Sequence, residues 1–302
     1  SEIDKLMSEN DYALAYEKIH ALLFEVWKEV ERILVPGGIA CINIGDATKT
    51  VNGVFRLYSN NTKITACFEE LGFLVLPNII WRKQTNAPNK FMGSGMYPPG
   101  AYVTYEHEYI LIFRKGDKRK FSAQEKANRR ESAYFWEERN KWFSDVWEFK
   151  GKSQIDKKIT SRDRSGAFPV DLAYQLINMF SVKGDTVVDP FVGTGTTMLA
   201  AAASERNCVG YEIDSSFDKV ILNNLINSVK FINSYISERV SRHIKFIEEE
   251  KLKGKKLYYN SNHDFNVKTK QETKILIRQV DSLSSIENGV IEVNYKPYDK
   301  GI

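Results

Sequence analysis

The feature that most constrains the fold is a glycine-rich segment, VVDPFVGTGTT, at residues 187–197. The run TVVD that leads into it predicts a β-strand, the alanine-rich run at 196–204 predicts a helix, and NCVGYE at 207–212 predicts a second strand. Glycines between a strand and a helix let the backbone come close to a ligand, and the N-terminus of the helix attracts negatively charged groups. The order strand, glycine-rich loop, helix, strand predicts an α/β protein.

The rest of the chain shows a similar alternation of apolar periodicities. The expected helices are 11–34, 62–71 and 169–181, and the other expected strands are 39–45, 73–81 and 108–113. Pro77 lies within the second of these strands and predicts a bulge or an edge position, because proline cannot donate a ladder hydrogen bond. We therefore expect a Rossmann-like sheet that is mixed but mostly parallel, with helices on both faces.

The composition is that of a folded protein. Of the 302 residues, 42% are hydrophobic and 27% are charged, which excludes a disordered chain or a coiled coil. Three cysteines leave an odd count with no close pair, so neither a disulfide framework nor a zinc site is expected, and we expect no metal. The chain has no long apolar run and its first residues do not resemble a signal peptide, so we expect a cytoplasmic protein that does not contact a membrane.

Positive charge is concentrated in one segment. The whole chain has a formal net charge of +4, but residues 114–164 contain 16 Lys and Arg against 9 Asp and Glu. Aromatic residues, including Trp136, Trp142 and Trp147, lie between these charges. Such a segment is either a nucleic-acid-binding surface or a plain solvated face.

The second strand of the glycine-rich unit ends in an acidic residue. Glu212 follows the loop by roughly 20 residues, at a position where a carboxylate can accept both hydroxyls of a ribose. The loop lacks the third glycine of the dinucleotide fingerprint. An adenosine with a short tail is therefore a better candidate ligand than a nicotinamide dinucleotide.

These segments resemble a known family. DPFVGTGTT followed by YEID is similar to the cofactor-binding region of the amino-group DNA methyltransferases, which use S-adenosylmethionine, and FPVDLAYQLINMFS at 168–181 is similar to the segment that wraps the methionine end. The resemblance extends over residues 11–234, and its order is that of the permuted β group. It implies a methyltransferase fold with a catalytic half at 1–114, an inserted target-recognition region at 115–165, a cofactor-binding half at 166–234 and a C-terminal extension at 235–302.

The resemblance assigns cofactor binding to ten residues. Glu212 would hold the ribose, Ile213 would pack against adenine, Thr196 and Thr197 would cap the helix near the methionine carboxylate, and residues 168–169 would close the far side. The full set is Phe168, Pro169, Asp189, Phe191, Gly193, Gly195, Thr196, Thr197, Glu212 and Ile213.

The implied activity is methyl transfer to an exocyclic amine of a flipped base in double-stranded DNA, cytosine N4 before adenine N6, as part of a restriction-modification system. Six residues in the basic segment and in the polar stretch after residue 82 are expected to contact DNA: Lys83, Asn86, Lys90, Arg119, Arg129 and Arg130. Two other classes stay open, a noncatalytic nucleic-acid-binding subunit or inactive fragment of this fold, and a methyltransferase for RNA or a small molecule.

One part of the family pattern is missing. The catalytic turn is Asp, Ser or Asn, then Pro-Pro, then an aromatic residue, and the only Pro-Pro here, Pro98-Pro99, has Tyr97 before it and Gly100 after it. We therefore assign no catalytic residue. In the permuted order the turn would precede Ser1, so we expect roughly 30–60 further residues there, or a second polypeptide or a second copy that supplies the missing strands.

Overall fold

The chain forms two compact units. The structure, a computed structural model, describes residues 2–8, 11–83, 94–148, 168–286 and 289–299. Unit 1 comprises Ser1–Lys120 and Ser144–Gly151, and unit 2 comprises Phe121–Phe143 and Lys152–Ile302. Each unit has its own hydrophobic core.

Unit 1 contains three helices and six strands among its described residues. They are α1 (Glu2–Ser8), α2 (Tyr12–Ile33), β1 (Ile39–Ile44), β2 (Ala47–Val51), β3 (Val54–Tyr58), α3 (Asn60–Glu70), β4 (Phe73–Arg82), β5 (His107–Lys115) and β6 (Val146–Glu148). Helix α2 begins at the N-cap Asp11, whose side chain accepts a hydrogen bond from the Leu14 N–H. The predicted helices and strands of this half are confirmed, each within about two residues at its ends.

The main sheet of unit 1 has the order β1-β5-β4-β6 and is mixed. Strands β1 and β4 run in the same direction, β5 lies between them and runs antiparallel to both, and β6 pairs with β4 in parallel. The mixed character was predicted, but parallel pairing does not predominate in this sheet. The reason is that β5 follows β4 without a helix in the described part of the connection, residues 94–106, and two strands joined in this way can pair antiparallel.

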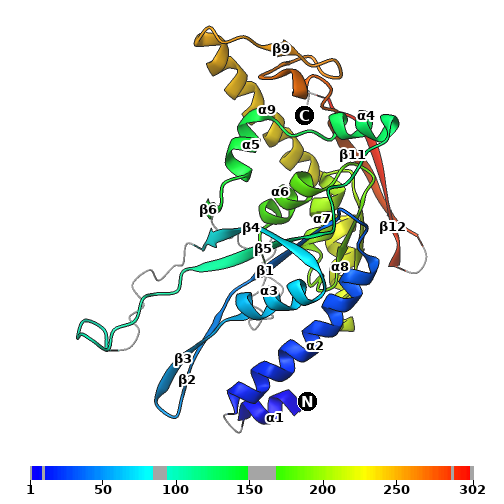
Figure 1. The fold of residues 1–302 in the computed structure, drawn as a ribbon. Helices are drawn as coiled ribbons and strands as arrows, with labels where there is room; N and C mark the ends of the chain where they lie inside the picture. Colours follow the sequence, from blue (N-terminus) through cyan, green and yellow to red (C-terminus); the bar gives the residue numbers. More distant parts are fainter. Residues whose placement is uncertain (1, 9–10, 84–93, 149–167, 287–288, 300–302) are drawn as a thin grey trace. The chain divides into compact units, whose positions relative to one another are not determined.

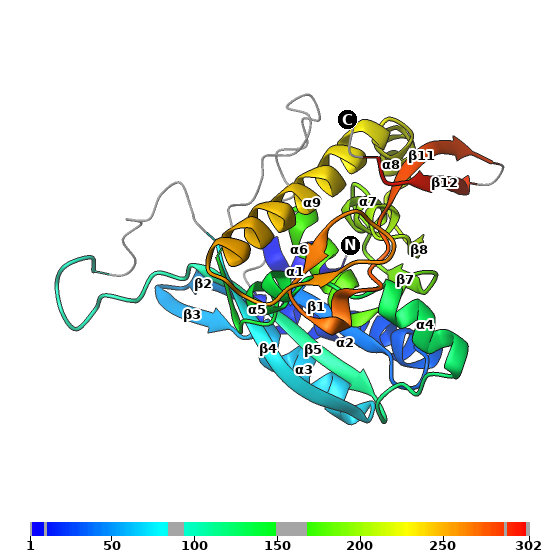
Figure 2. The same cartoon turned by 90° about the horizontal axis from the view of Figure 1, so that it is seen from above.

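The register of β4 against β5 shifts between Leu76 and Ile79, so the bulge expected at Pro77 is confirmed, although β4 is an interior strand. One face of the sheet packs against α2 and α3 (Figures 1 and 2). Phe68 on α3 is fully buried there and stacks on Phe113 of β5 with ring centroids 4.1 Å apart. This packing fixes the positions of β1, β4 and β5 in unit 1.

Unit 2 is mainly helical among its described residues. Its elements are α4 (Ala123–Glu131), α5 (Trp136–Trp142), α6 (Val170–Phe180), β7 (Thr186–Asp189), α7 (Thr196–Ala203), β8 (Asn207–Gly210), α8 (Asp218–Ile226), α9 (Val229–Leu252), β9 (Tyr258–Tyr259), β10 (Asn266–Val267), β11 (Arg278–Ser285) and β12 (Ile291–Pro297), with short 3-10 turns at Ser215–Phe217 and Lys270–Glu272. The predicted helix, strand, helix and strand between 169 and 212 are confirmed.

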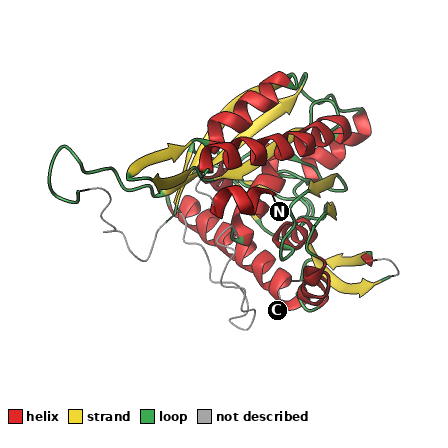
Figure 3. Cartoon of the chain, turned by 90° about the horizontal axis from the view of Figure 1, so that it is seen from below, coloured by secondary structure: helices red, strands yellow, loops and turns green. Residues whose placement is uncertain are grey.

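Strands β7 and β8 are parallel, as the glycine-rich unit predicts. Helix α7 buries Leu199 and the alanines that follow it, because small side chains let α6 and α9 approach closely. Strands β11 and β12 form an antiparallel hairpin (Figure 3), and Val280 on β11 is fully buried in the same core. The residues after 234 are thus an integral part of unit 2, and the predicted four-part division of the chain stays a prediction.

Among the described residues, no helix has both the length and the apolar content that crossing a bilayer requires.

Candidate functional site

The glycine-rich loop connects β7 to α7 through two positions that favour glycine. Gly193 has φ +53° and Gly195 has φ +89°, both in the left-handed region, where a side chain is strained. Gly195 is the N-cap of α7 and makes no side-chain cap. The prediction that Thr196 and Thr197 cap the helix is therefore wrong: they are its first two residues, and they leave its N-terminal N–H groups available for an anion.

The residue at the end of β7 is hydrogen-bonded to the loop and to the first turn of α7. Asp189 accepts hydrogen bonds from the Thr197 hydroxyl and, at 2.9 Å, from the Phe191 N–H. The loop also continues the pairing with β8, since the Val192 N–H donates to the Tyr211 carbonyl at 3.0 Å. The loop is therefore held in one shape by its own residues.

Glu212 joins the two halves of the site. One carboxylate oxygen accepts the Gly193 N–H at 3.0 Å and the other accepts the Asp214 N–H at 3.0 Å. Each oxygen keeps further lone pairs, so the group can accept ligand hydroxyls as well. This carboxylate is the only acidic group of the predicted set at the end of β8.

Solvent-exposed apolar side chains neighbour this carboxylate in the sequence or lie in the glycine-rich loop. Ile213 is fully exposed, Tyr211 is 61% exposed and Phe191 is 53% exposed. Open apolar side chains next to a carboxylate, a glycine-rich backbone and a helix N-terminus match the parts of an adenosine with a charged tail. The residues present therefore fit S-adenosylmethionine.

The other predicted cofactor residues lie at the start of α6. Pro169 is its buried N-cap residue, and Phe168 packs against the core of unit 2. Asp171 in the first turn accepts a hydrogen bond from the Tyr235 hydroxyl at 2.9 Å, which fixes α6 to α9. All ten predicted cofactor residues thus belong to unit 2, and their individual roles stay predictions.

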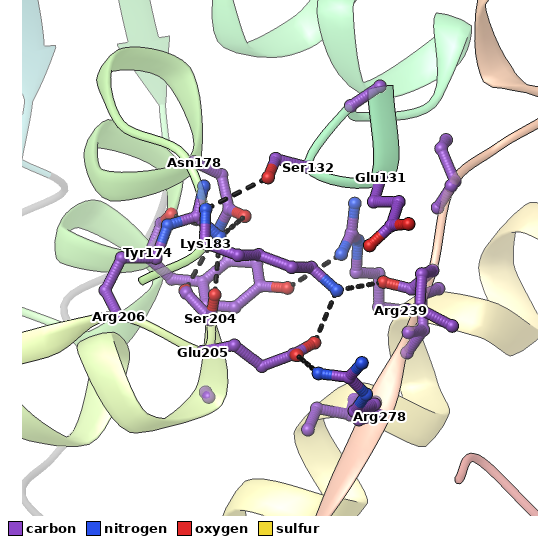
Figure 4. A pocket seen from close by; sticks show the side chains of 16 residues that line it. Glu131, Ser132, Tyr174, Asn178, Lys183, Ser204, Glu205, Arg206, Arg239 and Arg278 are labelled. Carbon is purple, nitrogen blue, oxygen red and sulfur yellow. Dashed lines mark hydrogen bonds and ion pairs between the residues drawn. The ribbon is translucent and has the colours of Figure 1, made fainter. Parts of the chain in front are cut away.

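A closed polar cluster behind the glycine-rich unit was not predicted. The Lys183 ammonium contacts Glu205 at 2.5 Å and the Leu276 carbonyl, and Arg278 reaches Glu205 at 3.0 Å from the other side (Figure 4). The space among these side chains is about 20 Å³, room for about one water molecule. Burial lowers the pKa of Lys183, although the Glu205 carboxylate opposes the shift. The cluster connects segments of the fold and is not a ligand pocket.

Helix α5 is attached to α9 by one buried ion pair and one buried hydrogen bond. Arg239 makes a bidentate contact with Glu138 at 2.7 and 2.8 Å, and His243 lies 2.7 Å from Glu137. These residues, with Trp136, also line a groove of about 620 Å³ between α5, α6 and α9. Sequence reasoning missed this groove because its walls are about 100 residues apart in the chain, and no pairing signal is visible in the sequence.

The predicted DNA-contacting residues are divided between the units. Lys83 follows β4 in unit 1 and is ion-paired with Glu108, which also accepts a hydrogen bond from Asn43 at 2.7 Å. Arg119 also lies in unit 1, whereas Arg129 and Arg130 are exposed in the last turn of α4 in unit 2. Asn86 and Lys90 lie outside the described residues. Within the described ranges, no group of three or more side chains could hold a metal ion.

Comparisons with known proteins identify the family of this chain. The family model described as DNA methylase, of the N6/N4 type, matches residues 3–223, and the model of the D12 class of N6 adenine-specific DNA methyltransferases matches residues 170–296. The type II methyltransferase M.MthZI of Methanothermobacter thermautotrophicus is 48% identical over 295 residues, which are 97% of this chain and 82% of that protein. The type II methyltransferase M.MjaI of Methanocaldococcus jannaschii is 53% identical over 221 residues, which are 73% of this chain and 72% of that protein.

Solved structures of DNA methyltransferases are similar to this chain as well. TTHA0409 of Thermus thermophilus, in complex with S-adenosyl-L-methionine, aligns with a TM-score of 0.58 and 34% identity over 70% of this chain and 77% of its own. The cytosine-N4-specific PvuII DNA methyltransferase aligns with a TM-score of 0.53 over 73% of this chain and 76% of its own, and at 17% identity it shows the shared α/β fold alone. The chain therefore belongs to the N6/N4 family of DNA methylases and is a type II, S-adenosylmethionine-dependent DNA methyltransferase that acts on an exocyclic amine, N6 of adenine or N4 of cytosine.

Proposed function

We propose that this chain methylates a base flipped out of double-stranded DNA, with cytosine N4 put ahead of adenine N6, and that it is the modification partner of a restriction nuclease. The observation that carries the proposal is the convergence, at the carboxyl ends of β7 and β8, of a rigid glycine-rich loop, a helix N-terminus and the Glu212 carboxylate. Carboxyl ends of parallel strands are where open α/β sheets bind their ligands.

S-adenosylmethionine, when bound, supplies a methyl group that a nucleophilic amine can attack. In our proposal Glu212 accepts the ribose hydroxyls, and the open side chain of Ile213 packs against the adenine. The N-terminus of α7, with Thr196 and Thr197, attracts the methionine carboxylate. Phe168 and Pro169 at the start of α6 close the far side. The loop residues Asp189, Phe191, Gly193 and Gly195 surround the cofactor.

The residues that bind the target amine are not assigned, because Pro98-Pro99 lies in an exposed turn with neither flanking residue of the family signature. Three expectations stay predictions. They are that a second copy or a second polypeptide is a further partner, that the protein is cytoplasmic, and that its sheet is mixed but mostly parallel with helices on both faces. Sedimentation of the purified chain measures the first of these directly.

Methyl incorporation tests the activity. Plasmid DNA from a host without DNA methylation is incubated with the full-length protein and S-adenosylmethionine that carries a labelled methyl group. The DNA is then digested to nucleosides, which are separated and identified by mass spectrometry. We expect label in N4-methylcytidine, and label in N6-methyladenosine instead would correct the base. Absence of label from both nucleosides, across plasmids of different sequence, would remove the proposal.

The DNA-contacting role of α4 has its own test. Neutralising Arg129 and Arg130 to glutamine should weaken DNA binding and flatten its salt dependence by about 0.9 in log–log slope for each phosphate that the variant no longer binds. Neutralising Lys255 and Lys256, which are exposed and lie outside the basic segment, is the matched control. Equal slopes for the two double variants would show that α4 is only a charged surface.

A further inference from the structure

The loop that leads into β5 exposes large apolar side chains at its tip. Met96 is 82% exposed, Tyr97 is 78% exposed and Val103 is 90% exposed. Residues 94–105 contain no charged side chain, so nothing in this segment solubilises the tip. Apolar side chains that stay in water do not stabilise the core. A cluster of exposed apolar side chains therefore indicates an interaction site.

The tip has a defined shape. The Ser94 N–H donates to the Gly100 carbonyl at 2.9 Å, the Tyr97 N–H donates to the Ser94 carbonyl at 3.4 Å, and the Ser94 hydroxyl donates to the Tyr97 carbonyl. These bonds close a turn that carries Met96 and Tyr97 on its outside. The two side chains are therefore presented together by an ordered backbone.

The base of the loop is fixed to the sheet of unit 1. Tyr102 stacks on Phe55 of the β2–β3 hairpin with centroids 4.5 Å apart and an interplanar angle of 12°. The Tyr105 hydroxyl accepts a hydrogen bond from the Asp46 N–H at 3.2 Å, directly after the end of β1. Loop and hairpin extend from the same edge of this sheet in two views (Figures 1 and 2). That edge carries the carboxyl ends of β1 and β4, the edge at which sheets of this class bind ligands.

Cations lie in the hairpin that the base of the loop contacts. The β2–β3 hairpin, residues 47–58, contains the exposed residues Lys49 and Arg56 and no acidic residue. An uncharged apolar tip on a loop whose base packs against a purely positive hairpin suits a partner with apolar surfaces between negative groups. Stacked bases between two phosphate backbones have this chemistry.

We propose that Met96 and Tyr97 form a wedge that enters the base stack of duplex DNA at the position the target base leaves, while Lys49 and Arg56 contact the flanking phosphates. This inference rests on the proposed function. Taking a base out of the stack breaks its pairing and stacking, and side chains that fill the vacated space stabilise the opened duplex. A pre-formed tip does so without a further ordering cost.

The test separates base opening from the other steps. Sequencing of methylated plasmid DNA first locates one modified site, and two oligonucleotide duplexes are made from it, one fully paired and one with a mismatch opposite the target base. The double variant Met96→Ala, Tyr97→Ala should lose roughly 10- to 100-fold in kcat/KM on the paired duplex. On the mismatched duplex, where the base is already unpaired, the loss should be less than about threefold.

Three controls keep the result specific. Leu252→Ala removes an equally exposed apolar side chain from the end of α9 and should change neither duplex. Met96→Leu, Tyr97→Phe keeps the apolar bulk and should retain activity on both. Calorimetric affinity for S-adenosylmethionine should be the same for all variants.

Equal losses on the two duplexes, or no loss on either, would overturn the wedge. A change in sedimentation of the alanine variant without a duplex-dependent loss would show instead that the tip joins two copies of the chain, which also overturns it. If the unaltered full-length protein methylates no plasmid, the proposed function fails and the wedge fails with it. If the unaltered chain methylates DNA and the variants do not discriminate, the wedge alone fails.

Discussion

Glu212 is the residue at which the cofactor proposal can be tested most directly. Replacing it with alanine removes the acceptor of the Gly193 and Asp214 N–H bonds, both 3.0 Å long, together with the proposed acceptor of the ribose hydroxyls. The side chain is half-buried, so water can reach the freed N–H groups, and each backbone bond is worth only about 0.5–1.5 kcal/mol net. Most of the effect should therefore appear in cofactor binding and little in folding.

The expected loss of S-adenosylmethionine affinity is about 1–3 kcal/mol, which raises Kd roughly 5- to 150-fold. Glu212→Gln should lose less, because it keeps one carbonyl acceptor while placing an amide donor against one of the N–H groups. Glu248→Ala, on the exposed side of α9, removes a carboxylate of the same kind and should leave Kd unchanged. Isothermal titration calorimetry measures all three variants.

A matched pair of ligands identifies the contact itself. S-adenosylhomocysteine and its 2′-deoxy analogue differ by one ribose hydroxyl, so the unaltered chain should prefer the former, and Glu212→Ala should bind both with nearly equal affinity. If the variant keeps the full preference between the two ligands, Glu212 does not bind the ribose and serves only to hold the loop against the end of β8.

Further predictions concern the framework of the molecule. Arg239→Met should lower the free energy of unfolding in urea by about 3–5 kcal/mol, because it leaves Glu138 buried without its ion-pair partner. Adding Glu138→Leu should recover most of that loss, and additive effects of the two substitutions would contradict the reasoning. Burial raises the pKa of the Cys41 and Cys208 thiols to about 12, so at pH 8 iodoacetamide should label them slowly in the folded chain and rapidly in urea. Burial also raises the pKa of Tyr295, whose hydroxyl donates to the Ala202 carbonyl. The stability that the protonated Tyr295 contributes is complete below about pH 10 and is lost as pH rises through the pKa of the folded state. Tyr295→Phe should therefore flatten the decrease of the urea midpoint at alkaline pH.

The glycine-rich unit could be predicted from the sequence nearly residue by residue. A strand that ends at Asp189 and a helix that begins at Thr196 are bounded by glycines whose backbone conformation no other residue adopts easily. The same local chemistry is present in the β2–β3 hairpin, where Asn52 and Gly53 have φ +50° and +79° at a two-residue turn. An Asn-Gly pair between two β-rich runs is the sequence signal for such a hairpin.

Pairings between distant segments could not be predicted. Nothing in the neighbourhood of Lys183 indicates that its partners are Glu205 and a carbonyl at residue 276, because the ion pair forms only when the chain has folded. The antiparallel position of β5 between β1 and β4 is likewise a property of the whole sheet. The basic segment shows the same limit, since its charge is visible but its division between two units is not.

The spacing of the two cores along the chain has a consequence for biosynthesis. The buried core of unit 1 lies between Trp27 and Phe113, whereas the core of unit 2 draws on residues from Phe135 to Leu283. A ribosome that adds about 5–20 residues per second needs roughly 10–30 s to go from the end of the first core to the end of the second. During that interval unit 1 can fold, whereas the glycine-rich loop stays exposed on the nascent chain until α9 and β11 have been synthesised. We therefore expect S-adenosylmethionine binding to arise only after β11 has left the ribosome.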